Sequence, residues 1–99
     1  TCTSKDISIS QSQNSTPEIP QFIVQIVNNC VSQCAPSDIH LHCGMFASAK
    51  VVNPILFKRV SDDDCLVNGG NPLAPSHIIR FTYYNTFSYP LAFKSAKFC

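Results

Sequence analysis

Ninety-nine residues are enough for one domain with a modest hydrophobic core. Hydrophobic residues make up 44% of the chain and charged residues 13%, which is a globular composition and excludes an intrinsically disordered chain. The net charge of +1 excludes the basic balance typical of nucleic-acid-binding proteins, and no apolar run approaches the ~18 residues of a membrane span. We therefore expect neither nucleic-acid binding nor membrane insertion.

The first third of the chain predicts two strands and a loop. Residues 6–11 (DISISQ) alternate, with Ile7 and Ile9 on one face, and predict a short strand. The polar stretch 12–21 contains two prolines and predicts a loop. Residues 22–28 (FIVQIVN) are β-branched and almost continuously apolar, which predicts a strand buried on both faces.

Residues 39–43 (IHLHC) alternate again and predict a third strand. Because the strand period is two, Ile39 and Leu41 should face the core, together with the cysteine that follows. His40 and His42 should then face outward.

The second half contains further apolar stretches at 46–52 and 55–60, separated by an Asn-Pro pair, and a strand around Leu66 and Val67. Residues 77–84 and 91–98 look like a hairpin pair joined across NTFSYP. No window shows a capped, amphipathic helix. The chain therefore predicts an all-β fold, a small disulfide-stapled β-sandwich or open barrel of about six to eight short antiparallel strands. We see one domain over residues 1–99, with no repeat and no dividing linker.

Six cysteines in so short a chain, without a Cys-x-x-Cys pair, favour three disulfides in a secreted domain over a metal or redox site. They are Cys2, Cys30, Cys34, Cys43, Cys65 and Cys99. Treating consecutive strands as hairpins places Cys2 at the same end as Cys30 and Cys34, so we favour a bond from Cys2 to one of these two. All fifteen connectivities that six cysteines allow stay formally open.

Asn14, Ser15 and Thr16 form a glycosylation sequon in a polar stretch, which agrees with secretion. Asn14 is therefore a candidate glycosylation site.

The stretch SDDDCLVNGGNPL (61–73) places three carboxylates against a cysteine and follows them with a glycine-rich turn. His40 and His42 together with these aspartates would be suitable ligands for zinc. Nothing in the sequence brings the two segments together, and the aspartates lack the spacing of a calcium-binding loop. We expect no metal and no cofactor, and predict instead a disulfide-anchored loop with a turn of positive φ at Gly69 and Gly70.

No catalytic constellation stands out. The cysteines are expected to be oxidised, no serine lies in Gly-x-Ser-x-Gly, and three glycines in the chain form no phosphate-binding loop. We therefore predict that the protein is not an enzyme. Tyr83, Tyr84, Phe87 and Tyr89 cluster near the last strands, and an exposed row of them could stack on sugars. An extracellular carbohydrate-binding module is thus the alternative function, although the chain has no Trp.

Four stretches resemble the TAPETUM DETERMINANT family of small secreted plant proteins. They cover most of the chain and contain all six cysteines: CTSKDISISQ (2–11), VQIVNNCVSQCAPSDIHLHCGMFASAKVVNPILFKRV (24–60), DDDCLVNGGNPL (62–73) and FTYYNTFSYPL (81–91). The family hallmark Asp-Asp-Cys-Leu-Val-Asn, followed by Gly and Pro-Leu, is met at 63–73, and Cys-Gly-x-Phe-x-Ser-Ala is met at 43–49. Met45 stands where the family usually has Trp, and Asp62 where it tends to have Tyr, which suggests a paralogue.

The resemblance implies a secreted, extracellular (apoplastic) ligand of a plant leucine-rich-repeat receptor kinase that acts in cell-fate specification of the anther and tapetum type. The implied partners are the receptor ectodomain and, as a further candidate, a co-receptor kinase. Our candidate receptor contacts are the charges that border the DDDC loop, namely Lys58, Arg59, Asp62, Asp63 and Asp64.

Overall fold

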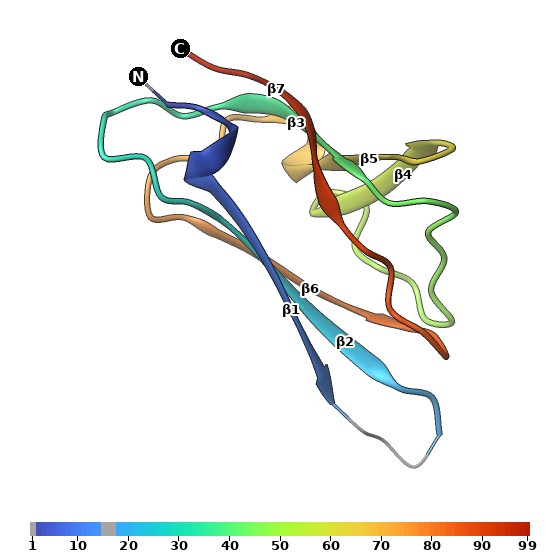
Figure 1. Cartoon of the computed structure of the whole chain (residues 1–99). Helices are drawn as coiled ribbons and strands as arrows, with labels where there is room; N and C mark the ends of the chain where they lie inside the picture. Colours follow the sequence, from blue (N-terminus) through green and yellow to red (C-terminus); the bar gives the residue numbers. More distant parts are fainter. Residues whose placement is uncertain (1, 15–17) are drawn as a thin grey trace.

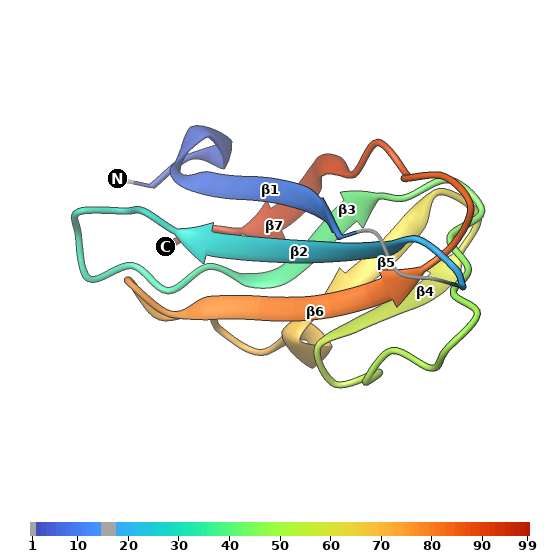
Figure 2. The same ribbon diagram turned by 90° about the horizontal axis from the view of Figure 1, so that it is seen from below.

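The structure is a computed structural model that describes residues 2–14 and 18–99. It consists of two antiparallel sheets packed face to face (Figures 1 and 2). The first sheet has the order β1–β2–β6 and the second the order β4–β5–β3–β7. The strands are β1 (Ile7–Asn14), β2 (Gln21–Asn28), β3 (Ser37–His42), β4 (Phe57–Ser61), β5 (Asp64–Val67), β6 (Ile78–Tyr84) and β7 (Ala92–Lys97). The all-β sandwich prediction is confirmed, and both sheets are open rather than closed into a barrel.

Helix in the described part of the chain is limited to two single-turn 3₁₀ segments, η1 (Ser4–Asp6) and η2 (Asn68–Gly70). Thr3 caps η1 through its hydroxyl, and Asp6 accepts back from the Thr3 N–H, which is a capping box. Gly69 and Gly70 have φ values of 62° and 81°, so the predicted positive-φ turn is confirmed. No helix in the described residues has the length and apolar character needed to cross a bilayer.

In the first sheet, β1 and β2 form a hairpin whose register runs from Ile7 opposite Asn28 to Asn14 opposite Gln21. β6 pairs with the other side of β2. The prediction that β2 is buried on both faces is wrong. Its side chains alternate between buried and half-buried, because only one face packs on the second sheet and the outer face meets solvent.

The prediction that the last two strands form a hairpin is wrong. β6 and β7 do not pair, because β6 bonds to β2 and β7 bonds to β3 in the other layer. The connection between them crosses the sandwich and buries Tyr89, whose N–H donates to the Tyr83 hydroxyl at 3.0 Å. β2 and β3, also neighbours along the chain, lie in different sheets as well. The inward and outward sides of β3 are as predicted, with Ile39 and Leu41 fully buried.

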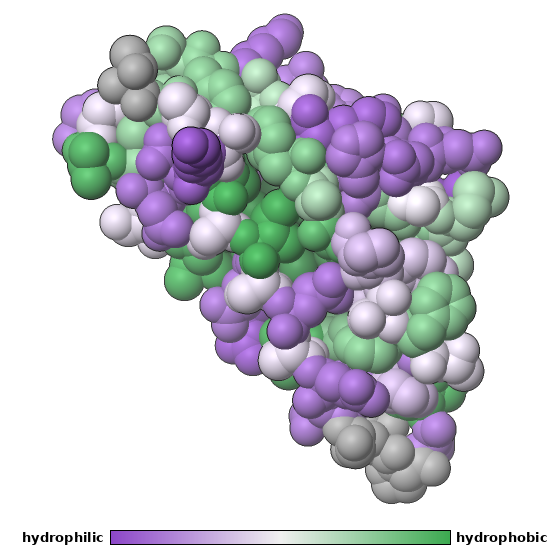
Figure 3. All heavy atoms as spheres, viewed as in Figure 1, coloured by the Kyte–Doolittle hydropathy of each residue, from purple (hydrophilic) through white to green (hydrophobic). Residues whose placement is uncertain are grey.

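The core lies between the two sheets and is rich in aromatic rings. Phe46 packs edge-on against Phe57 and Tyr83, with centroids 5.0 and 5.1 Å away, and Phe57 stacks on Phe81 at 4.3 Å. Ile9 and Phe93 are partly buried and pack against this cluster. In the view of Figure 1, hydrophobic residues are visible between β1 and β7, with hydrophilic residues on either side (Figure 3). Such aromatic pairs stabilise the folded state by more than the burial of their apolar area alone would.

Residues 44–56, which include the apolar stretch 46–52, form a long irregular segment. Of the apolar stretch 55–60, only the part from Phe57 onward belongs to a strand, β4. The backbone of this segment bonds to the end of β6, where the Ala49 N–H donates to the Tyr84 carbonyl at 2.8 Å. Its single buried side chain in the stretch 44–51 is Phe46. The apolar residues there are thus divided between one core anchor and an exposed surface.

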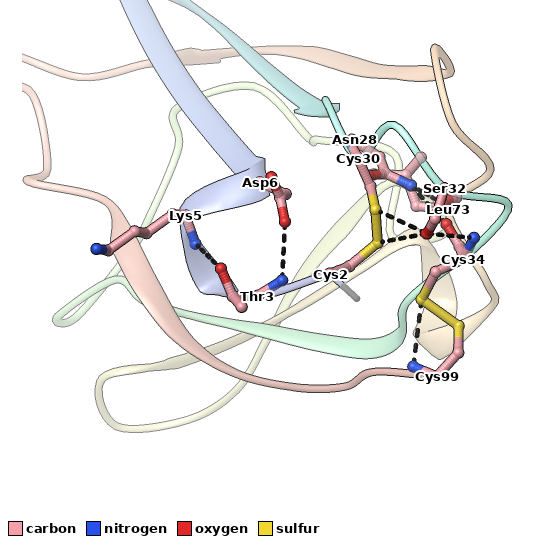
Figure 4. Close-up of a disulfide and its surroundings, with 10 residues drawn as sticks. All are labelled: Cys2, Thr3, Lys5, Asp6, Asn28, Cys30, Ser32, Cys34, Leu73 and Cys99. Atoms are coloured by element: carbon pink, nitrogen blue, oxygen red, sulfur yellow. Dashed lines mark hydrogen bonds between the residues drawn. A yellow bond between two sulfur atoms is a disulfide. The ribbon is translucent and has the colours of Figure 1, made fainter.

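Three disulfides join all six cysteines, as predicted: Cys2–Cys30, Cys34–Cys99 and Cys43–Cys65. Cys2 bonds one of the two favoured partners. The short loop from Cys30 to Cys34 therefore holds both ends of the chain (Figure 4).

Asn28, a fully buried polar residue, organises the backbone around that loop. Its amide donates to the carbonyls of Cys34 (3.1 Å) and Leu73 (2.9 Å), and its Oδ1 accepts from the Cys30 N–H (2.9 Å). A buried amide that satisfies three backbone groups is costly to replace, because each group would be left without a partner.

Asn14, the glycosylation candidate, is the last residue of β1 and is exposed. Its Nδ2 donates to Gln21 Oε1 at 3.3 Å. Ser15 and Thr16, the rest of the sequon, lie outside the described residues.

Candidate functional site

The first residues of the two motifs behind the family resemblance lie side by side at one end of the second sheet. The Cys43–Cys65 bond joins them covalently. The Gly44 N–H donates to Asp63 Oδ1 at 2.9 Å, and the Asp63 N–H donates to the Gly44 carbonyl at 2.8 Å. Both residues have positive φ, 57° and 56°, so each forms a tight turn against the other. Residues 44–45 and 59–63 thus form one rigid unit, which we call the tip.

The histidines and aspartates come together on the outer face of the second sheet. His40 on β3 lies with Nδ1 2.6 Å from Asp64 Oδ1 on β5, and with Nε2 3.2 Å from Asp38 Oδ1. The hydrogen bond to Asp64 raises the pKa of His40 above its usual 6.5, with desolvation opposing and Asp38 assisting. Both ring nitrogens can donate only when the imidazole is protonated. The geometry therefore favours an imidazolium clamped between two carboxylates.

A second pair anchors the tip itself. His42 Nδ1 lies 2.7 Å from Asp63 Oδ2. The pKa of Asp63 is lowered, mainly by the Gly44 N–H and then by His42, and the pKa of Asp64 is lowered mainly by His40. Lys94 on β7 donates to the Asp63 carbonyl at 3.1 Å. Asp63 and Asp64, two of the three consecutive aspartates, therefore make hydrogen bonds that connect segments within the protein.

The pH dependence of stability follows from these shifts. Because the pKa of His40 is raised on folding, its contribution is fully present below about 6.5 and is lost as pH rises through the folded value. The lowered pKa values of the two aspartates have the opposite sense, so their contribution to stability is lost as pH falls below about 3.8.

We expect His40→Gln to lower the urea midpoint more at about pH 5.5 than at about pH 8.5, because the protonated imidazole stabilises the folded state at the lower pH.

His77→Gln is the matched control for this experiment, because His77 is exposed and lies away from the tip in the turn before β6. Its urea midpoint should track the wild-type midpoint at both pH values. A His40→Gln penalty that grew with rising pH would contradict the clamped imidazolium.

The cluster does not converge on a metal. The pairing of β3 with β5 brings these segments together, which the sequence alone does not indicate. Both ring nitrogens of His40, however, already face carboxylates on opposite sides. Within residues 2–14 and 18–99, only Cys2, Asp6 and Cys30 bring three potential ligand atoms within 4.8 Å of one another. Those two cysteines are bonded to each other, so they offer no thiolate.

The His40–Asp64 pair has the geometry of a base held by a carboxylate, but its second nitrogen points at Asp38 rather than at a nucleophile. Catalysis by such a base needs a hydroxyl or thiol within reach of that nitrogen. In the described residues, this arrangement joins β3 to β5.

The five candidate contact residues separate into two kinds. Lys58, Arg59 and Asp62 are exposed, and Arg59 Nη1 lies 3.3 Å from Asp62 Oδ1. Asp63 and Asp64 are turned toward the histidines, and Asp64 is only half-buried rather than exposed. Sequence reasoning missed two exposed apolar neighbours. Met45 is 61% exposed, with its Sδ 3.6 Å from Arg59 Nη1, and Val60 is 46% exposed.

The aromatic row behind the carbohydrate alternative does not form among the described residues. Tyr83 and Tyr89 are buried, and Tyr84 is half-covered with the Lys50 ammonium 4.7 Å from its ring centroid. Phe87 is 54% exposed, so its ring is accessible to solvent. These positions therefore do not supply a row of rings facing solvent.

Fold and site together define a small, disulfide-bonded β-sandwich protein whose two sequence motifs are joined by a disulfide and by hydrogen bonds at the tip. Residues 3–99 match the family model described as Tapetum determinant 1, C-terminal. The chain belongs to this family, as the resemblance implied.

Two relatives show the extent of the likeness. TPD1 protein homolog 1 of Arabidopsis thaliana is 47% identical over 96 residues, covering 95% of this chain and 54% of that protein. TPD1 protein homolog 1B of Oryza sativa subsp. japonica is 49% identical over 74 residues, covering 75% of this chain and 43% of that protein. The chain thus spans about half the length of the curated relatives it matches. No solved structure matches it.

Proposed function

We propose that this protein is a secreted, extracellular ligand of a leucine-rich-repeat receptor kinase and acts in cell-fate specification of the anther and tapetum type. The proposal depends on one observation, the family membership that covers residues 3–99. A co-receptor kinase is a second proposed partner. Three disulfides in 99 residues support an oxidising, extracellular location, since such bonds are rare in reducing compartments.

The tip supports recognition by shape and charge. Its backbone is fixed by one disulfide and by paired hydrogen bonds between Gly44 and Asp63, so little conformational entropy is lost on binding. Exposed on it are Arg59, Asp62 and Met45, beside Lys58 on β4. Arginine and methionine are enriched in protein interfaces, and a leucine-rich-repeat solenoid offers an extended concave surface for such a convex edge. We propose Lys58, Arg59 and Asp62 as direct contacts, with Asp63 and Asp64 as positioning residues.

A non-catalytic mode of action fits the same geometry. The charged residues of the cluster are paired with one another in the folded chain: His40 with Asp38 and Asp64, and His42 with Asp63. A ligand needs such groups only to hold its surface in place, whereas an enzyme would need at least one of them poised toward a substrate.

Reversing two charges at the edge tests the proposal. Lys58→Glu combined with Arg59→Glu is expected to slow association with the receptor ectodomain about tenfold at low salt, and less at high salt, because rim charges act mainly on the association rate. The measurement is surface plasmon resonance against a panel of leucine-rich-repeat ectodomains at two salt concentrations. Circular dichroism should show an unchanged fold.

Lys5→Glu combined with Lys97→Glu is the matched control. It makes the same change in net charge at exposed positions in η1 and at the end of β7, away from the tip. If both double variants slow association equally, net charge rather than this edge steers the encounter. Wild-type protein that binds no ectodomain in the panel would overturn the receptor proposal.

A further inference from the structure

A hollow in the surface is lined by residues 47–49 of the irregular segment, which follow the tip residues Gly44 and Met45 along the chain. It has a volume of about 340 Å³ and a mostly apolar lining. Its walls come from three parts of the chain: Ile19 before β2, residues 47–49, and the end of β6 at Tyr84 with the following Asn85 and Thr86. Neither the receptor proposal nor the candidate contact residues make use of this feature.

The hollow exists because small side chains stand on a fixed backbone. Ala47 and Ala49 leave space that larger residues would fill, and both are exposed. The Ala49 N–H donates to the Tyr84 carbonyl at 2.8 Å, and the Tyr84 N–H donates to Ser48 Oγ at 2.9 Å. Asn85 Nδ2 also donates to the Ala47 carbonyl at 3.2 Å. The walls are therefore preorganised, which lowers the entropic cost of accepting an occupant.

One charge stands at the rim of the hollow. The Lys50 ammonium lies over the Tyr84 ring, 4.7 Å from its centroid. No carboxylate of residues 2–14 or 18–99 lies within ion-pair distance of it. Next to it, the Val51 side chain is 95% exposed. The patch thus combines an apolar depression, an exposed aliphatic side chain and a cation that has no ionic partner among the described residues.

We propose that this hollow, with Lys50 and Val51, is a second docking surface, which accepts an apolar side chain of the receptor ectodomain that has a carboxylate next to it. The inference rests on the proposed receptor function and specifies the chemistry of the contact. The carboxylate would pair with Lys50, and the apolar side chain would enter the depression and contact Ala47 and Ala49.

The shape of the hollow favours a macromolecular occupant over a free small molecule. Small-molecule sites enclose most of their ligand's surface, whereas this depression is broad and open to solvent, as its exposed alanines indicate. A side chain that projects from a protein surface has the rest of its area covered by surrounding contacts, of which Val51 would be one. An anchor in a pocket with a near-neutral surround is the common anatomy of such interfaces.

Filling the hollow tests the inference. Ala49→Trp should weaken binding to the receptor ectodomain at least about tenfold, mainly by faster dissociation, because the anchor side chain loses its place. Lys50→Glu should also weaken binding about tenfold through repulsion of the partner's carboxylate. Dissociation rates are measured by surface plasmon resonance against the ectodomain that binds wild type. Thermal melting and intact mass establish that each variant folds with three disulfides.

Val31→Trp and Lys97→Glu are the matched controls. Val31 is fully exposed in the loop between Cys30 and Cys34, and Lys97 ends β7, so the controls introduce the same tryptophan side chain and the same charge reversal far from the hollow. Both controls should bind as wild type does.

The possible outcomes separate the two proposals. If wild type binds an ectodomain and Ala49→Trp binds equally well, the hollow is overturned and the receptor function stands. Equal losses of receptor binding in the hollow variants and in their controls would also overturn the docking role of the hollow. So would self-association of the wild type that Ala49→Trp abolishes. If wild type binds no ectodomain, the receptor function fails, and the docking role of the hollow fails with it.

Discussion

Removing the Cys43–Cys65 bond, by changing both cysteines to serine, is expected to lower the free energy of unfolding by about 2–5 kcal/mol. Both cysteines are almost completely buried within the main core, and the bond joins the Gly44 turn to the start of β5. Its loss should therefore loosen the tip as well as destabilise the sandwich. Receptor binding should weaken through this loss of order, even though neither sulfur faces solvent.

The matched variant replaces Cys2 and Cys30 with serine. The two bonds close loops of similar length, with sequence separations of 22 and 28 residues, so the unfolded chain should gain similar entropy in both cases. The Cys2–Cys30 bond lies in a separate small cluster at the far end of the fold. Guanidinium unfolding should show the larger loss for the Cys43–Cys65 variant. Equal losses would mean that chain entropy alone, without core packing, accounts for both bonds.

Phe46→Ala is the second large change, with an expected loss of about 3–5 kcal/mol. The Phe46 ring packs against Phe57, Tyr83 and Tyr89, at centroid distances of 5.0, 5.1 and 5.3 Å, and the cavity left behind would lie between the two sheets. Phe46 also anchors the irregular segment that links the tip to the hollow. Its removal should therefore weaken both proposed contact surfaces at once.

Phe87→Ala provides the comparison, because Phe87 is 54% exposed and contacts only Tyr89 among the core rings. The same substitution there should cost well under about 1.5 kcal/mol, the scale of one aromatic pair. Urea unfolding, with hydrogen exchange of the amides of residues 44–51, measures both effects. Unchanged exchange in that segment of the Phe46→Ala protein would show that the backbone bonds to β6 suffice to hold it.

Local pattern predicted the strands better than it predicted their partners. Alternation at Ile7 and Ile9, and at Ile39 and Leu41, identifies half-buried strands because the pleat has a period of two. The same pattern does not say when the chain changes layers. The segment NTFSYP looks like a hairpin connection. In the structure, however, Tyr89 is buried in the core, and the connection runs from β6 in one sheet to β7 in the other. A β-branched run likewise does not reveal that the outer face of β2 has no covering layer.

The site was visible in the sequence only in parts. Outward His40 and His42 and the run of aspartates were each noticed, but their pairing depends on β3 and β5 becoming neighbours, which no local signal encodes. Met45 is a single apolar residue, and its exposure follows from the turn that Asp63 imposes on Gly44. The hollow has even less signal, since it consists of small residues at 47–49 and depends on their hydrogen bonds to β6. The sequence predicts Asn28 only as the end of a strand, because its burial and its three backbone partners arise from long-range packing.

The two terminal disulfides also determine how the molecule would respond to tension. A pull on Cys2 and Cys99 passes through the Cys2–Cys30 bond, along the three residues between Cys30 and Cys34, and out through the Cys34–Cys99 bond. This path is covalent throughout and bypasses every strand of both sheets. Single-molecule stretching from these ends should therefore extend the oxidised protein by little more than that loop. Thiol reduction would expose the sheets to the force. A domain linked by its ends to a cell wall or to a larger precursor would be shielded mechanically while its oxidation state is kept.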